Sequence, residues 1–138
     1  MRLTFRNLIT PGLLRLKGAP TTPILEAMGL QLVSITKRAF NSAELRPSPW
    51  APVKKKTGAP LKRSGALWQS IRIVDVNEKT VTVGTDRPYA AYHQFGTKHI
   101  PARPFFPFDA SGKITPRALD LLRKVAAKRI QRDRQTII

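Results

Sequence analysis

Residues 67–84 read LWQSIRIVDVNEKTVTVG, and this stretch decides the fold. Ile71 and Ile73 alternate with polar residues, and Val81 and Val83 alternate with threonines further along. The polar run at residues 77–79 separates the two segments. Alternation with a period of two, in segments rich in β-branched residues, predicts a β-hairpin closed by a short polar turn. Because a lone hairpin is marginally stable in water, the apolar face of this one requires helices to cover it.

Two amphipathic segments, one on each side of the hairpin, are predicted to supply that cover. The first helix is expected at residues 22–40, with Thr22 as N-cap, Pro23 at the first helical position and an apolar stripe of Leu25, Met28, Leu32 and Ile35. The second begins with Thr115 as N-cap and Pro116, and its stripe consists of Leu119, Leu122, Val125, Ala126 and Ile130. The predicted class is therefore α+β, one antiparallel β-sheet packed by an N-terminal and a C-terminal helix.

The chain length of 138 residues predicts a single domain spanning residues 1–138. Residues 1–20 contain Pro-Gly and Gly-Ala-Pro breakers and are expected to form a flexible N-terminal arm, and residues 131–138 a C-terminal tail. The first residues lack the continuous apolar run and cleavage site of a secretory leader. No apolar run reaches the ~18 residues that a membrane helix needs, so we expect a soluble protein without membrane contact, made in the cytoplasm.

The charge balance indicates the kind of partner. The chain has 25 Lys and Arg against 8 Asp and Glu, a formal net charge of +17, and no cysteine. Such a surplus predicts contact with a polyanion or with acidic protein surfaces. Residues 42–66 are rich in proline and glycine and are predicted to form a long basic loop. The basic residues expected to face DNA or a partner are Lys54, Lys55, Lys56, Lys62 and Arg63 in this loop, and Arg123, Lys128 and Arg132 in the last helix. The alternative interpretation of each run is a solvated face.

Catalysis and metal binding find little support in the sequence. Hydroxyl nucleophiles are available in Ser64, Ser70 and Thr97, and the only imidazoles are His93 and His99. No nucleophile motif frames them, and no carboxylate pair lies near either histidine. We therefore expect no enzymatic activity, no metal site and no cofactor, with His93 a partly buried helix residue that is hydrogen-bonded locally.

Residues 89–108 are the most informative segment. A short helix is predicted at residues 89–96, ended by Gly96, and three prolines then favour an extended path. The simplest interpretation is a buried aromatic core made by Tyr89, Tyr92, Phe95, Phe105 and Phe106. That interpretation does not explain why Gln94 and Arg103 are placed between these aromatic residues.

This segment carries a family resemblance. YAAYHQFGT at residues 89–97, followed by IPARPFF at 100–106, resembles the signature of the phage virion morphogenesis (tail completion) family of Mu-like phages. It is also similar to the Glu-Phe-Gly-Thr and Pro-Ala-Arg-Pro-Phe pattern of head-tail joining proteins in long-tailed phages. Upstream, PWAP at 49–52 and LKRSGALWQSI at 61–71 resemble that family's Trp-x-Pro loop and its path into the first strand. The resemblance covers roughly residues 22–110, and the two chain ends match nothing in the pattern.

The resemblance implies a structural protein of the virion neck that assembles as a sixfold ring and joins head to tail. Its partners would be copies of itself, the portal or adaptor, and the tail terminator or tail-tube proteins, with nonspecific contact to passing DNA. The residues expected to contact a subunit or partner are Trp50, Tyr89, Tyr92, His93, Gln94, Phe95, Arg103, Phe105 and Phe106. Trp50 and the lysine loop are expected to reach a neighbour or DNA, and Arg103 to fix the turn beneath the aromatic residues. The alternative is a nucleic-acid-binding protein without sequence preference.

Overall fold

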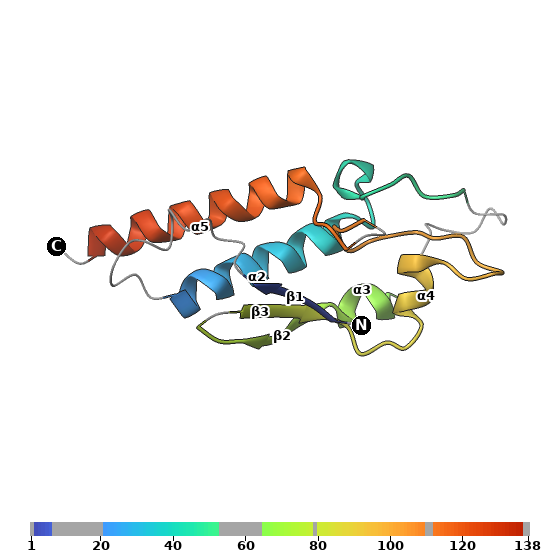
Figure 1. Ribbon diagram of the computed structural model, residues 1–138, viewed down its shortest axis with the longest axis horizontal. Coiled ribbons are helices and arrows are strands. Elements are labelled where there is room, and N and C mark those ends of the chain that lie inside the picture. The colour runs from blue at the N-terminus through green and yellow to red at the C-terminus, as the bar shows by residue number, and fades with distance from the viewer. Residues whose placement is uncertain (1, 7–20, 53–64, 79, 110–111, 137–138) are drawn as a thin grey trace.

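The computed structural model describes residues 2–6, 21–52, 65–78, 80–109 and 112–136, with the backbone alone for residues 2–6, 21 and 133–136 (Figure 1). Its two long helices are α2 (Thr21–Arg38) and α5 (Pro116–Thr136), and α4 (Ala90–Phe95) is a short helix. The remaining elements are β1 (Arg2–Arg6), the 3-10 turn η1 (Ala43–Leu45), α3 (Ala66–Ser70), β2 (Arg72–Val76) and β3 (Thr80–Gly84).

The sheet has three strands in the order β1-β3-β2, all antiparallel. The predicted hairpin is confirmed as β2 and β3, with Asn77 closing the turn through its side-chain oxygen, which accepts the Thr80 N–H at 2.9 Å. The register shifts between Ile73 and Asp75, so Val74 is an extra residue that bulges from β2. The central position of β3 between two partners agrees with the burial of Val81–Gly84.

The expectation of a flexible arm at residues 1–20 is wrong for residues 2–6, which form strand β1 on the free edge of β3. The sequence RLTFR alternates polar and apolar residues with the period of a strand, but it is short, flanked by arginines and 74 residues or more from its partner in the chain. Its pairing is long-range, and a window of five residues does not reveal it. The rest of the predicted arm, residues 7–20, lies outside the described residues.

Helix α2 packs on the sheet through the predicted stripe, since Leu25, Met28, Leu32 and Ile35 are all buried. It begins at Thr21, one residue before the expected start. Gly29 lies at the closest approach to the strands, where an added Cβ would stand 2.6 Å from Cγ2 of Val81. A glycine that lowers helix propensity is therefore explained by the close packing of helix on sheet.

Helix α5 packs along α2, so that α2 lies between α5 and the sheet (Figure 1). The predicted cap is confirmed, because the Thr115 side-chain oxygen accepts the Ala118 N–H at 3.3 Å. Leu122, Ala126 and Ile130 are buried, whereas Leu119 and Val125 are half-buried. The predicted tail at residues 131–138 is wrong for residues 131–136, which continue the helix. Arginine and glutamine favour helix, so the polar composition of this end does not stop it.

The α+β class predicted from the sequence is thus confirmed. The predicted loop at residues 42–66 is only partly described: Ala43–Leu45 form a 3-10 turn, and Gly65, with φ of 71°, leads into α3. Helix α3 was missed, because a single five-residue turn leaves no periodic signal. Helices α3 and α4 lie together at one end of the sheet (Figure 1). None of the described helices is long and apolar enough to cross a membrane.

Candidate functional site

Gln94 is the residue that organises the segment between α4 and α5. Its side chain is only 3% exposed, and its Oε1 accepts the backbone N–H groups of Phe105 at 3.0 Å and Phe106 at 2.9 Å. Its Nε2 donates to the carbonyl oxygen of Phe106 at 3.3 Å. One side-chain amide thus forms hydrogen bonds with three backbone groups of a buried, irregular segment. These groups take no part in the β-sheet, and the side chain supplies hydrogen-bond partners for them. The polar residue that the sequence left unexplained is a structural brace.

The braced segment carries phenylalanines into the core. Phe105 and Phe106 have no exposed surface, and their ring centroids lie 4.9 Å apart. Phe105 also meets Phe40 at the end of α2 at 5.4 Å, and Phe106 stacks on Phe108 at 6.1 Å. These tilted and stacked pairs add to the apolar area that they bury. Gly96, with φ of 76°, permits the tight return, because a Cβ there would lie 2.8 Å from the backbone nitrogen of Ala102.

A second brace ties residues 50–52 to the same segment. The indole Nε1 of Trp50 donates to the carbonyl oxygen of Pro104 at 2.8 Å. In the opposite direction, Arg103 donates through Nε to the carbonyl oxygen of Ala51 at 3.0 Å and through Nη2 to that of Pro52 at 3.2 Å. Arg103 therefore holds a neighbouring loop in place, in addition to its own backbone N–H, which bonds to the carbonyl oxygen of His93 at 2.7 Å.

Arg46, which follows the 3-10 turn η1, adds further contacts to this brace. Its guanidinium lies 3.6 Å from the centroid of the Trp50 ring, a cation–π contact, while Phe40 meets the same ring edge-on at 6.1 Å. The Arg46 side chain also donates to the carbonyl oxygens of Ala39 at 2.6 Å and Phe40 at 3.2 Å. These carbonyls follow directly on Arg38, the last residue of α2, and the carboxyl end of a helix favours a cation.

The outer side of this rigid scaffold is an exposed apolar surface, which we call the α4 surface: Tyr89, Tyr92, Phe95 and Ile100 with the neighbouring Lys98. Tyr92 is 54% exposed and Phe95 is 55% exposed. Beside Phe95 lies a shallow pocket of about 240 Å³ whose lining is mainly apolar, formed by Pro47, Ser48, Gln94, Phe95, Ala102, Pro104, Phe108 and Asp109. Large aromatic side chains kept in water on a rigid frame are typical of a docking surface.

The structure divides the predicted contact residues into two groups. Gln94, Phe105 and Phe106 are buried inside the chain, so the expectation that they touch a partner directly is wrong. Trp50 is half-buried and its ring and N–H are engaged within the chain, so it anchors residues 50–52. The residues with surface to offer are Tyr89, Tyr92, His93, Phe95 and Arg103. Conversely, the predicted burial of Tyr89, Tyr92 and Phe95 is wrong, because α4 directs these side chains away from the sheet.

The basic residues predicted to face DNA or a partner lie in the predicted loop before α3 and on α5. Lys54, Lys55, Lys56, Lys62 and Arg63 lie outside the described residues. Arg123, Lys128 and Arg132 are exposed on α5. Arg123 and Lys128 form no ion pair with any residue that the structure describes, whereas Arg117 pairs with Glu44 at 3.4 Å and Lys124 with Asp120 at 3.0 Å.

The candidate nucleophiles and imidazoles are not brought together among the described residues. The hydroxyl of Ser70 pairs with that of Thr85 and with the carbonyl oxygen of Leu67, and the Thr97 hydroxyl accepts the N–H groups of His99 and Ile100. Ser64 lies outside the described residues. Within the described part of the chain, no three His, Cys, Asp or Glu residues gather as metal ligands would.

His93 differs from its predicted environment. Its ring meets Tyr89 edge-on at 5.9 Å, and its buried Nδ1 has no hydrogen-bond partner within the described residues, so the expected local bond is wrong for that atom. Burial lowers the pKa of His93, and the positive charge of Arg103 lowers it further. Both effects favour the neutral form of the imidazole.

Sequence reasoning missed Arg46, Ile100 and Phe108. Arg46 precedes Pro47 in a segment without periodicity, and its role depends on the end of a helix that it does not belong to. Ile100 and Phe108 each stand next to a proline within residues 89–108, and that proximity was the available signal.

Comparison with known proteins identifies the family of this chain. Residues 7–124 match the phage virion morphogenesis family. The chain is also similar to the Mu-like prophage FluMu G protein 2 of Haemophilus influenzae (strain ATCC 51907 / DSM 11121 / KW20 / Rd), with 36% identity over 106 residues that cover 70% of this chain and 75% of that protein. No solved structure matches the chain. The protein belongs to the phage virion morphogenesis family, and its role is a structural one in the assembly of phage particles.

Proposed function

We propose that this protein acts in the neck of a tailed phage, where copies of it form a sixfold ring that completes the tail and joins it to the head. In this proposal it performs no reaction. It is made in the host cytoplasm and becomes part of the virion, in contact with the portal or adaptor on one side and the tail terminator or tail-tube proteins on the other.

The observation that carries the proposal is the α4 surface on its double brace. Tyr92 and Phe95 are more than half exposed, yet the segment that follows them and residues 51–52 are held together by Gln94, Trp50 and Arg103 through bonds to six backbone groups. Exposed aromatic side chains that lie together on a well-supported segment are typical of a surface that another protein covers, because that contact removes their apolar area from water. Membership of the family and the name of the Mu-like relative support a partner within the phage particle.

Deletion of the gene from the phage or prophage that carries it tests this proposal. We expect full heads and finished tails to accumulate unjoined in lysates, and to join in vitro when the purified protein is added. Electron micrographs of the separated particles give the measurement. Normal infectious particles in the deletion strain, or tails that never polymerise, would contradict a role in joining.

A second candidate function, nonspecific binding to nucleic acid, is favoured by one feature. Arg123 and Lys128 are exposed on the outer side of α5 without an ion pair among the described residues, in a chain of net charge +17. Such binding would run through phosphates, and the logarithm of its affinity would fall by about 0.9 per contact for each decade of salt. Replacement of both residues by glutamine should reduce the slope of log affinity against log salt concentration, measured on random duplex DNA, by about the amount that two phosphate contacts contribute. An unchanged slope would remove α5 from consideration.

A further inference from the structure

The exposed aromatic residues of the α4 surface could be covered by another protein surface. The outer face of α2 carries a surface whose side chains are complementary to them. Leu30 is 60% exposed, the most exposed large apolar side chain in the described part of the molecule. Glu26 lies four residues earlier on the same helix, so that the two side chains are neighbours on one face. We call Glu26 and Leu30 the α2 surface.

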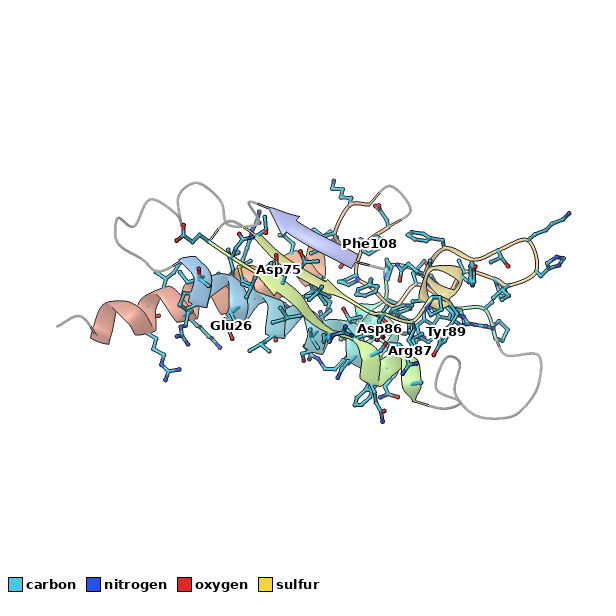
Figure 2. The ribbon with its side chains drawn as sticks, turned by 90° about the horizontal axis from the view of Figure 1, so that it is seen from below. Glu26, Asp75, Asp86, Arg87, Tyr89 and Phe108 are labelled. Carbon is cyan, nitrogen blue, oxygen red and sulfur yellow. The ribbon has the colours of Figure 1, made fainter. Side chains whose placement is uncertain are left out.

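The charges of the two surfaces are opposite. Lys98 belongs to the α4 surface and Arg103 lies beside it, and Lys98 forms no ion pair with the described residues. Glu26 likewise forms no ion pair with them, and neither do Asp75 and Glu78 in the hairpin. Figure 2 shows Glu26 and Asp75 in one half of the molecule and Asp86, Arg87 and Tyr89 toward the other end. Glu26 and Asp75, two acids without an ion pair among the described residues, thus lie away from the end of the molecule that carries Tyr89.

The shapes also correspond. The pocket beside Phe95 has a volume of about 240 Å³ and a floor of proline and phenylalanine, which suits one aliphatic side chain and part of its helix. One acid, Asp109, lines the pocket edge, and its Oδ1 already accepts the Lys113 N–H at 3.0 Å. The apolar residue most available to fill the pocket is Leu30 of another copy.

We infer that the α4 surface of one subunit binds the α2 surface of a second copy of this chain in a head-to-tail contact, with Leu30 in the pocket beside Phe95 and Glu26 against Lys98. This inference rests on the proposed ring and names the contact that builds it. A contact of the α4 surface with itself would oppose Lys98 and Arg103 to their own copies, which carry the same charge. Two different surfaces on one chain generate a ring when the rotation between neighbours closes.

Two single substitutions in the full chain test the contact. Leu30→Gln and Phe95→Gln each remove one side of it at positions that are more than half exposed, so both proteins should keep the melting temperature of the parent. We expect each to raise the concentration at half-assembly about tenfold or more, which corresponds to about 1.4 kcal/mol or more for the loss of a central anchor. Ala127→Gln, at an exposed position on α5, is the matched control and should assemble like the parent. Analytical ultracentrifugation and native mass spectrometry give the measurement.

Mixing the two variants distinguishes a head-to-tail contact from any other. Each variant keeps one intact surface, so an equal mixture should form dimers with a single good contact and stop there. The charge pair has its own test: Glu26→Lys and Lys98→Glu should each weaken assembly, and the double variant should restore it. Failure of the double variant to recover would overturn the assigned pairing.

The remaining outcomes separate this inference from the proposed function. Normal rings from both glutamine variants would overturn the head-to-tail contact while leaving the ring in place, and lost joining of heads and tails by such rings would assign the α4 surface to a different virion protein. A parent protein that stays monomeric at all concentrations and on particles would contradict the ring itself, and the inference with it.

Discussion

The indole Nε1 of Trp50 donates a hydrogen bond of 2.8 Å to the carbonyl oxygen of Pro104, which lies 54 residues further along the chain. Arg103, the neighbour of Pro104, returns two bonds to the carbonyl oxygens of Ala51 and Pro52. Residues 50–52 and residues 103–104 thus each donate hydrogen bonds to the other segment. Because each bond helps to position the partners of the other bonds, the effects of changing Trp50 and Arg103 should be coupled.

Trp50→Phe and Arg103→Gln test this coupling by a double-mutant cycle. Each single change should lower the free energy of unfolding by about 1 kcal/mol, the usual net value of a hydrogen bond, with solvent reducing the contribution of the half-exposed guanidinium. The double variant should lose less than the sum by about 0.5 kcal/mol or more, because the first change already releases the partner segment. Urea denaturation measures all four proteins. Strict additivity would mean that the two contacts act independently.

Gln94→Leu should be more damaging than either of those changes. Leucine fills much of the same volume but leaves the N–H groups of Phe105 and Phe106 buried without partners, while the carbonyl oxygen of Phe106 keeps the Phe108 N–H at 2.8 Å. We expect a loss of about 2–4 kcal/mol, since each unsatisfied buried group costs about 1–3 kcal/mol and local rearrangement recovers part of it. Thermal unfolding followed by circular dichroism gives the measurement. A loss below that of Trp50→Phe would show that the segment is held mainly by its phenylalanines.

The sequence predicted those features whose signals are local. The hairpin, the stripes of α2 and α5, the Thr115 cap and the end of α4 at Gly96 all follow from periodicity and from turn or cap residues within a few positions. Strand β1 and the brace between Trp50 and Arg103 depend on pairings across more than 50 residues, for which a single sequence holds no signal.

The sequence singled out the segment that carries the exposed aromatic residues, but it did not predict the direction in which each side chain points. Residues 89–108 stood out for their aromatic residues and prolines, and Tyr92 and Phe95, which we propose as part of a docking surface, lie there. Which aromatic residues point inward depends on how a six-residue helix is set against the sheet. Phe105 and Phe106 are buried while Tyr92 and Phe95 are exposed, although hydrophobicity alone ranks the phenylalanines alike. The orientation is a property of tertiary packing.

Gly29→Ala tests the close packing of α2 on the sheet. Alanine normally stabilises a helix interior by up to about 1 kcal/mol over glycine, but here its Cβ would stand 2.6 Å from Cγ2 of Val81 and 3.0 Å from Cδ1 of Ile73. We expect a net loss of about 1–3 kcal/mol, the usual result of overpacking. Because Val81→Ala would make room for the new methyl, the double variant should lose less than the two single changes added together. A stabilised Gly29→Ala protein would show that the strands can move aside.

The environment of His93 makes folding stability depend on pH in a definite direction. In the unfolded chain its pKa is close to 6.5, and in the folded protein burial and then Arg103 lower that pKa. Among the described residues, the Tyr89 ring contacts the imidazole and the positive charge of Arg103 acts on it, and neither group is a carboxylate that could favour the protonated form. The unfolded state therefore binds more protons than the folded state just below the unfolded pKa.

Stability from His93 is accordingly complete above pH about 7 and declines as the pH falls through 6.5 toward the lower folded pKa. Replacement of His93 by glutamine should flatten the change in free energy of unfolding between pH about 7 and about 5, whereas His99→Gln, at an exposed position, should leave the parent's slope intact. Urea denaturation at a series of pH values measures the three slopes. An equal slope in the His93 variant would assign the pH dependence to the carboxylates, and a rising stability toward pH about 5 in the parent would reverse the sign argued for this imidazole.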